Sequence, residues 1–455
     1  MCLVRFKILV LFFLLFLLET VFAAEQTITL DLKSCIEKVV RYHPELNEYK
    51  TDIEAYKAKL AQAEAASLPQ IELIALGGPS VEAKKEAISP VVRTDVKSTT
   101  INGVFGMLIM QALQPIYTFG KISGYKEAAK SGIKVSQAEL EKKRSELILK
   151  TKELYWSLAL VRELKVVAEE IKKELEKAIN KTEEDLKKDI PLADELTLYK
   201  LKTYFGEVKR NINEIEKNES IIIEALKFMT ATPKGATLQI TTEPLKPEDF
   251  TLKPEDLVKN AFFLRPEIIQ INEAVKAKQA LIDVERSNLY PQIFLMLRGS
   301  ISGATNRERI HNPYISDPLN ESTLAVVLGA KLNVDFGITK GRIKEAEAEY
   351  QRILDKKRFA EEGIPLQIKK AYLEYLEASQ SIKDLEEAHK NAKKWLVAAD
   401  ANIDMGVGEM KDLADAILAY ATTKINYLKA LYNQKIAIAN LIQASGMDKS
   451  EREVN

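Results

Sequence analysis

The chain has 455 residues and carries 66 basic and 66 acidic side chains, so its formal net charge is zero. A nucleic-acid-binding protein would show a basic patch or stripe, and this balance gives no sign of one. Charged residues make up 29% of the chain and fall mostly in helical patterns, whereas glycine and proline gather at the joints. We therefore expect well-solvated helical surfaces and no nucleic-acid partner.

The first 23 residues have the pattern of a secretory signal peptide. Arg5 and Lys7 precede an apolar run over residues 8–18, and Val21-Phe22-Ala23 offers the small residues of a cleavage site. An uncleaved membrane anchor is the alternative, but a helix that spans a bilayer needs about 20 apolar residues. Cys35 would then be the only cysteine of the mature protein, so no internal disulfide is expected.

An internal repeat governs the rest of the chain, because residues 30–77 align with residues 252–299 without a gap. The copies share a Pro-Glu joint, a Pro-Gln-Ile motif and, further on, a Phe-Gly pair. These motifs stand at Pro44-Glu45 and Pro266-Glu267, at Pro69-Gln70-Ile71 and Pro291-Gln292-Ile293, and at Phe119-Gly120 and Phe336-Gly337. One structural unit is thus used twice, and each copy reads helix, strand, strand, long helix, helix.

The repeat predicts how the chain is divided. After the signal peptide over residues 1–23, we expect a first repeat over 24–229 and a linker over 230–253. A second repeat follows over 254–446, and a C-terminal tail over 447–455. The linker is rich in proline, and Ile240 is a candidate for a short strand within it.

Each repeat offers two strands of about ten residues, the length that a tilted strand needs to cross a bilayer. The predicted strands cover about residues 70–78 and 100–116 in the first repeat, and 291–301 and 323–335 in the second. Polar loops are expected between them, over residues 78–98 and 302–322. Because about eight strands are the practical minimum for a closed barrel, four strands that span a membrane would require the chain to oligomerise.

The Phe-Gly pairs begin long helical segments, which run to about residue 188 and to about residue 405. At 1.5 Å per residue each would be on the order of 100 Å long. Pro365 lies inside the second one, where it predicts a kink or a local break. Returning helices over residues 192–229 and 410–444 would complete two coiled-coil hairpins.

The search for chemistry finds no catalytic, cofactor-binding or metal-binding pattern. The three histidines, His43, His311 and His389, do not occur in the His-x-x-x-His or Glu-x-x-His spacing of a zinc site. The sequence has no P-loop, no dinucleotide-binding glycine motif and no nucleophile elbow. We therefore expect a protein that is not an enzyme and that needs no cofactor.

The turn of the second hairpin is the one place in the sequence where polar residues gather in a pattern that could mark a functional site. Gly406 and Gly408 predict a turn, and Asp412 and Asp415 lie one helical turn further on, on the same side of a helix. Helix capping or compensation of the helix dipole is the plainer interpretation. We match Asp194 of the first hairpin with Asp412 and Thr197 with Asp415, so the acidic pair belongs to one repeat only.

These motifs, in this order and twice over, resemble the TolC-type outer-membrane efflux proteins over nearly all of the mature sequence. The Leu-Pro-Gln and Tyr-Pro-Gln exits into the first strands and the turn Gly406–Ala416 contribute to the resemblance. The family implies a mainly α fold with a small β part: long helical hairpins plus four strands per chain. It also implies a homotrimer, with a twelve-stranded β-barrel in outer-membrane lipid and an α-helical tunnel across the periplasm.

The resemblance further implies the exit channel of a tripartite efflux or type I secretion system, working with a periplasmic adaptor protein and an inner-membrane pump. By this resemblance, Asp412 and Asp415 align with the family's periplasmic gate. The turn formed by Gly406, Val407 and Gly408 aligns with the family's adaptor contact. The chain departs from the family at Ile403, where some members have a gating tyrosine, and at Gly408, where they have an arginine. The alternative is a periplasmic coiled-coil adaptor or scaffold. The sequence leaves open whether the substrate is a drug, a metal ion or a protein.

Overall fold

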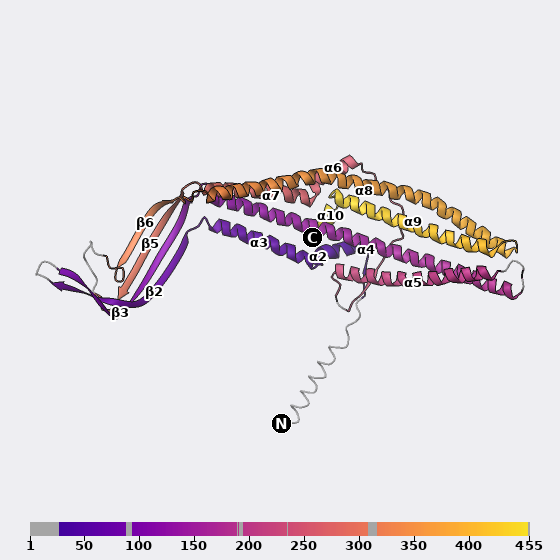
Figure 1. The fold of residues 1–455 in the computed structure, drawn as a ribbon, viewed down its shortest axis with the longest axis horizontal. Coiled ribbons are helices and arrows are strands. Elements are labelled where there is room, and N and C mark those ends of the chain that lie inside the picture. Colours follow the sequence, from indigo (N-terminus) through magenta and orange to yellow (C-terminus); the bar gives the residue numbers. More distant parts are fainter. Residues whose placement is uncertain are drawn as a thin grey trace, which may run out of the picture. The chain divides into compact units, whose positions relative to one another are not determined.

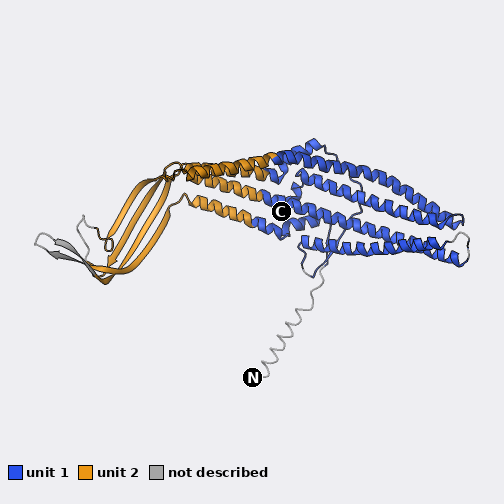
Figure 2. Ribbon diagram, in the orientation of Figure 1, with its two compact units in different colours: residues 1–50, 138–268, 359–455 blue, residues 51–137, 269–358 orange. Residues whose placement is uncertain are grey.

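The computed structural model describes residues 27–87, 93–188, 190, 194–233, 235–307 and 316–453, so the predicted signal peptide lies outside the described residues. The chain forms two compact units (Figure 2). Unit 1 contains residues 1–50, 138–268 and 359–455, and unit 2 contains residues 51–137 and 269–358. Each unit takes residues from both predicted repeats, so the compact units and the sequence repeats divide the chain in different ways.

The same order of elements occurs in both halves of the chain (Figure 1). The first half contains α2 Leu32–Tyr42, α3 Glu45–Ala65, β2 Gln70–Ala87, β3 Arg93–Tyr117, α4 Lys121–Lys187 and α5 Glu195–Met229. The second half contains α6 Pro254–Leu264, α7 Pro266–Ser287, β5 Gln292–Ala304, β6 Ser322–Lys331, α8 Ile338–Asp404 and α9 Met410–Ala444. The fold is therefore mainly α with a small β part. None of the helices in the described ranges combines the length and the apolar character that a membrane-spanning helix requires.

The two long helices have equal lengths, and so do the two returning helices. α4 and α8 each have 67 residues, and α5 and α9 each have 35. At 1.5 Å per residue, α4 and α8 each extend about 100 Å. Pro365 was predicted to kink or locally break the helix, and there is no break, since α8 continues through this residue. Its neighbours Ile364 and Ile368 are buried against α6 and α9, and this packing holds the helix where one backbone hydrogen bond is lost.

Four antiparallel strands form one sheet in the order β2-β3-β5-β6, which makes β2 and β6 its edge strands. β2 was expected to end near residue 78, but it continues to Ala87, and β3 begins already at Arg93. The sequence-based boundary was wrong because the polar composition of residues 78–98 predicted a loop, whereas β2 continues through Pro79. An edge strand tolerates proline, since one row of its backbone groups has no ladder partner. Residues 88–92 of the predicted loop lie outside the described residues.

The second hairpin of the sheet differs from the prediction at its far end. β6 ends at Lys331, which pairs with Gln292, the first residue of β5, so residues 332–335 have passed the end of their neighbour. Asp335 instead caps α8, and its carboxylate accepts hydrogen bonds from the amides of Gly337 and Thr339. The loop between β5 and β6 is fastened by a buried ion pair of 2.6 Å between Arg307 and Asp317, while residues 308–315 lie outside the described residues.

Unit 1 also contains a small parallel sheet that the sequence indicated only in part. β4, Thr237–Ile240, includes the residue suspected of lying in a strand, and it pairs with β1, Thr27–Leu30. Cys35 packs beside these strands with Tyr155 and is fully buried. Burial raises the pKa of the Cys35 thiol to about 12, so this thiol is protonated and packs as an apolar side chain.

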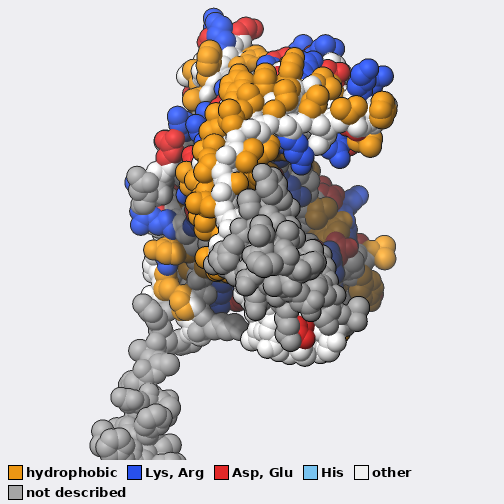
Figure 3. Space-filling view, turned by 90° about the vertical axis from the view of Figure 1, so that its left-hand side faces the viewer, with side chains coloured by type: hydrophobic (Ala, Val, Ile, Leu, Met, Phe, Trp, Pro, Cys, Tyr) orange, Lys and Arg blue, Asp and Glu red, His pale blue; other side chains and the backbone are white. Residues whose placement is uncertain are grey.

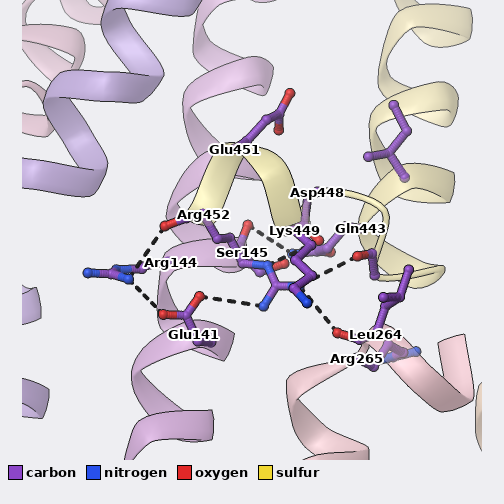
Figure 4. A network of polar contacts seen from close by, with 12 residues as sticks. Glu141, Arg144, Ser145, Leu264, Arg265, Gln443, Asp448, Lys449, Glu451 and Arg452 are labelled. Atoms are coloured by element: carbon purple, nitrogen blue, oxygen red, sulfur yellow. Dashed lines mark hydrogen bonds and ion pairs between the residues drawn. The ribbon is translucent and has the colours of Figure 1, made fainter. Parts of the chain in front are cut away.

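The C-terminal residues were expected to be a tail, but they form the short helix α10, Lys449–Arg452, which is anchored in unit 1 (Figure 4). The guanidinium of Arg452 is buried and lies 3.6 Å from the Glu141 carboxylate of α4 and 3.4 Å from that of Asp448. Arg452 also donates a hydrogen bond to the carbonyl of Leu264, at the Arg-Pro-Glu joint of the second repeat.

The same helix makes two further connections to α4. Lys152 forms an ion pair of 2.8 Å with Glu451, and Arg144 donates to the backbone carbonyl of Arg452. α10 thus ties a long helix of the first repeat to a joint of the second. A helix this short is stable only through such tertiary contacts, which explains why no local pattern predicted it.

The network predicts a pH dependence that originates at Asp448. Burial raises the pKa of its carboxyl group, so the folded chain holds this proton more tightly than the unfolded chain does. The contribution of Asp448 to stability is therefore fully present below its ordinary pKa of about 4 and is lost as the pH rises through the raised value. Asp448→Asn is neutral throughout, so the unfolding temperature of the wild type should fall relative to Asp448→Asn between about pH 4 and pH 7. A difference that stays constant over this range would contradict the assignment.

Candidate functional site

The turn between α8 and α9 is built from the backbone hydrogen bonds that end a helix. The amide of Gly406, at φ 73°, donates to the carbonyl of Ile403, and the amide of Val407 donates to that of Asn402. This pair of bonds is the Schellman arrangement, and glycine accommodates its left-handed residue without strain. Gly408 is needed for a different reason, because a Cβ at this position would lie 2.9 Å from backbone atoms of Asn402 and Ile403.

The turn presents apolar side chains to solvent. Val407 is 74% exposed and Met405 is 67% exposed, at the end of a hairpin whose long helix α8 is rich in charge. Immediately after the turn, α9 buries Leu413, Ala414 and Ile417 against the first hairpin. The start of α9 is thus held by packing, whereas Met405 and Val407 before it are exposed to solvent.

The two aspartates of the predicted gate lie on the solvent side of this packed helix. The N-cap of α9 is Glu409, which makes no side-chain capping bond. Asp412 is therefore not the cap residue, although it stands in the first turn, where a negative charge complements the helix dipole. Its side chain is exposed, whereas Asp415, one turn further on, is half-buried.

Asp415 forms an ion pair with Lys200 of α5, with 2.6 Å between Oδ1 and Nζ. This hydrogen bond raises the pKa of Lys200 and keeps it charged. Lys200 and Asp415 are each the sixth residue of their returning helix, so they occupy equivalent positions of the two repeats. The sequence-based match of Thr197 with Asp415 was three residues out of step. Thr197 corresponds to Asp412, and Asp194, which caps α5, corresponds to Glu409.

A second ion pair joins the hairpins close to their tips. Lys181, near the end of α4, lies 2.9 Å from Asp404, the last residue of α8. In both pairs the lysine comes from the first hairpin and the aspartate from the second. Exposed pairs of this kind contribute about 0–1 kcal/mol each, so they can position the second hairpin and still be broken at low cost. The sequence reasoning missed both lysines, because their pairing depends on how the hairpins pack.

The described residues contain no cluster of three or more histidine, cysteine, aspartate or glutamate side chains that could hold a metal ion. Among the described residues, the ionisable side chains at the hairpin ends are paired with each other or exposed to solvent.

Comparison with known proteins identifies the family and the fold of the chain. A profile of the outer membrane efflux protein family matches residues 36–187 and 257–447. Solved structures with the same fold include the CmeC outer membrane channel of Campylobacter jejuni, at 17% sequence identity and a TM-score of 0.75, covering 93% of this chain and 89% of that one. VceC of Vibrio cholerae has 15% identity and a TM-score of 0.74, with 91% and 96% covered. The open-state MtrE channel of Neisseria gonorrhoeae has 17% identity and a TM-score of 0.71, with 91% and 88% covered. The search of curated proteins found no match.

The chain belongs to the outer membrane efflux protein family. It is a channel of the outer membrane that extends into the periplasm, and it is neither an enzyme nor a separate periplasmic adaptor or scaffold.

The turn geometry predicts that Gly408→Ala loosens the tip. The added methyl group meets backbone atoms, and overpacking of this kind typically costs about 1–3 kcal/mol. Hydrogen–deuterium exchange should therefore speed up at the amides of residues 405–410. Gly363→Ala is the matched control, since Gly363 lies inside α8 and its added Cβ would meet no atom within 4 Å. Equal exchange at the tip in the two variants would show that the close contact at Gly408 is unimportant.

Proposed function

We propose that three copies of this chain close one exit channel, with twelve strands in outer-membrane lipid and the long helices forming a tunnel through the periplasm. The observation that carries the proposal is the four-stranded sheet with two edge strands. A closed barrel needs about eight strands or more, and backbone groups at an open edge cannot be left without partners in hydrocarbon. Three identical sheets joined edge to edge meet both requirements.

The two faces of the sheet support this use. Pairing places one set of exposed apolar side chains on a single face: Ile71, Leu73, Leu108, Leu295, Ile301, Leu324, Val326 and Leu328. Hydrophobic side chains also gather over the strands in the view of Figure 3. The opposite face holds a polar row in which Glu72, Gln111 and Arg298 stand opposite one another on neighbouring strands. Such alternation suits a sheet with lipid on one side and an aqueous lumen on the other.

The hairpin ends are the proposed periplasmic gate. Three copies would bring Asp412 and Asp415 around the threefold axis, where crowded carboxylates attract cations. Within each copy Lys200 neutralises Asp415, so the unpaired charge of the closed gate belongs chiefly to Asp412. Opening would move the second hairpin away from the first and break the pairs Lys200–Asp415 and Lys181–Asp404.

The proposed partners follow from the exposed tip. The compact apolar turn of Gly406, Val407 and Gly408 could bind a periplasmic adaptor protein. The adaptor would join the channel to an inner-membrane pump. The pump would choose the substrate, whether a drug, a metal ion or a protein, since the channel itself is a passive conduit.

The gate proposal predicts the results of planar-bilayer recordings. Asp412→Ala should lower cation selectivity and weaken block by trivalent cations, because it removes the unpaired carboxylate. Lys200→Ala should strengthen both properties, because it removes the counter-charge of Asp415. Asp384→Ala, which removes a carboxylate from α8 twenty residues before its end, is the matched control and should change neither. If selectivity and block are unchanged in both gate variants while the assembly stays intact, Asp412 and Lys200 have only a structural role.

A further inference from the structure

The two halves of the chain enter their long helices through the same unusual joint. Phe119 and Phe336 both have a left-handed backbone, at φ 50° and 48°, and each is followed by a glycine of positive φ. Such a conformation is rare for a bulky residue and persists where surrounding contacts hold it.

In the first half these contacts are present within the chain. The ring of Phe119 stacks on that of Tyr290, with 5.0 Å between centroids and 11° between planes, and Tyr117 packs against its edge. The ring of Phe336 is 99% exposed, although its backbone has the same strained conformation. The second joint therefore calls for a partner from outside the chain.

The repeat identifies the surface that this partner must present. Tyr290 stands before Pro291, and its counterpart in the first repeat is Leu68, which stands before Pro69 and is 60% exposed. β3, which leads to Phe119, pairs with β5, which follows Tyr290. Their counterparts are β6 and β2, the two edge strands of the sheet. At the first joint, this contact forms within one chain. At the second joint, the equivalent contact can form between two copies of the chain.

We propose that Phe336 packs on Leu68 of the partner subunit, and that β6 pairs with the partner's β2 in the register that β3 and β5 use within the chain. The inference rests on the proposed assembly and adds its contact residues and strand register, which the assembly alone does not specify.

The register follows from three observed pairings. Gln70 lies opposite Leu113, and Gln292 lies opposite Lys331, so Lys331 is the counterpart of Leu113. Within the chain Leu113 lies opposite Met296. The counterpart of Met296, counted from the same Pro-Gln-Ile motif, is Ile74.

Lys331 should therefore lie opposite the partner's Ile74, and Ala330 opposite the partner's Ala75. Two features of the chain support this register. First, it joins the apolar face of β6 to the apolar face of the partner's β2, whereas a slip by one residue would join unlike faces. Second, it gives residues 332–335 a strand to pair with. These residues were predicted to be strand from the sequence, yet they lie beyond the end of β5.

Membrane lipid is the other surface that an exposed aromatic ring at a barrel rim could meet. The second copy is favoured because Phe336 shares its backbone conformation with Phe119, whose ring is held by a protein side chain. Lipid would impose no particular backbone conformation.

Cysteine cross-linking of the full-length protein in outer membranes tests the register. Directly opposite residues have Cα atoms about 4.5–5.5 Å apart, within reach of a disulfide, whereas diagonal neighbours lie about 7–8 Å apart. Ala75→Cys with Ala330→Cys should give covalent dimers and trimers on oxidation. The shifted pairs Leu73→Cys with Ala330→Cys and Ala75→Cys with Leu328→Cys should give far fewer. Preferential cross-linking of a shifted pair overturns the register. Absence of any assembly in the uncross-linked protein overturns the proposed function itself.

Substitutions at the joint test the contact independently of the register. Phe336→Ala should lower the temperature at which the assembly dissociates in detergent, and Phe263→Ala, another exposed phenylalanine, should not. Leu68→Tyr should raise that temperature, because it recreates the Tyr290–Phe119 stack between subunits. Dissociation temperatures that do not respond to Phe336→Ala and Leu68→Tyr overturn the contact. So does a Phe336→Ala effect confined to membrane retention, which would assign the ring to lipid.

Discussion

The open edges of the four-stranded sheet are the constraint on which the rest of the molecule depends. In hydrocarbon each unsatisfied backbone group costs several kcal/mol, so the edge strands β2 and β6 need partners before the sheet can lie in a membrane. In the proposed assembly, identical copies would supply these partners. Because β3 leads into α4 and β6 into α8, closure of the sheet in that assembly would also set where the long helices begin.

The helices depend on packing rather than on charge. α9 buries Leu413, Ala414 and Ile417 beside the first hairpin, and α6 packs with α8 and α9 around Leu257, Ile368 and Leu441. By contrast, the ion pairs Lys200–Asp415 and Lys181–Asp404 are partly exposed and individually weak. The proposed gate needs this difference, because its opening would break the weak ion pairs at the hairpin ends and leave the packed helical core intact.

Much of the fold could be predicted from the sequence because its signals are local. The Pro-Glu joints, the Phe-Gly pairs and the helical periodicity depend on backbone preferences, and they placed α4, α8 and the returning helices within a few residues of their observed ends. Errors arose where distant residues decide the outcome. β2 continues past Pro79 because it is an edge strand. α8 has no break at Pro365, where Ile364 and Ile368 are buried, and α10 forms because Arg452 reaches α4.

The candidate site was predictable only in outline. Gly406 and Gly408 indicated the turn, and the spacing of Asp412 and Asp415 indicated a shared side of one helix. Neither pattern could reveal Lys200, because its pairing with Asp415 depends on the packing of two helices far apart in sequence. The repeat could have pointed to Lys200, because Lys200 and Asp415 occupy equivalent positions in the two hairpins. The correct alignment of the hairpins, however, required the observed starts of α5 and α9.

The mass of the mature protein purified in mild detergent tests the central claim most directly. If three copies close one channel, native mass spectrometry should find a complex of three chains and no stable smaller species. A protein that remains monomeric after gentle extraction from the outer membrane would contradict the account.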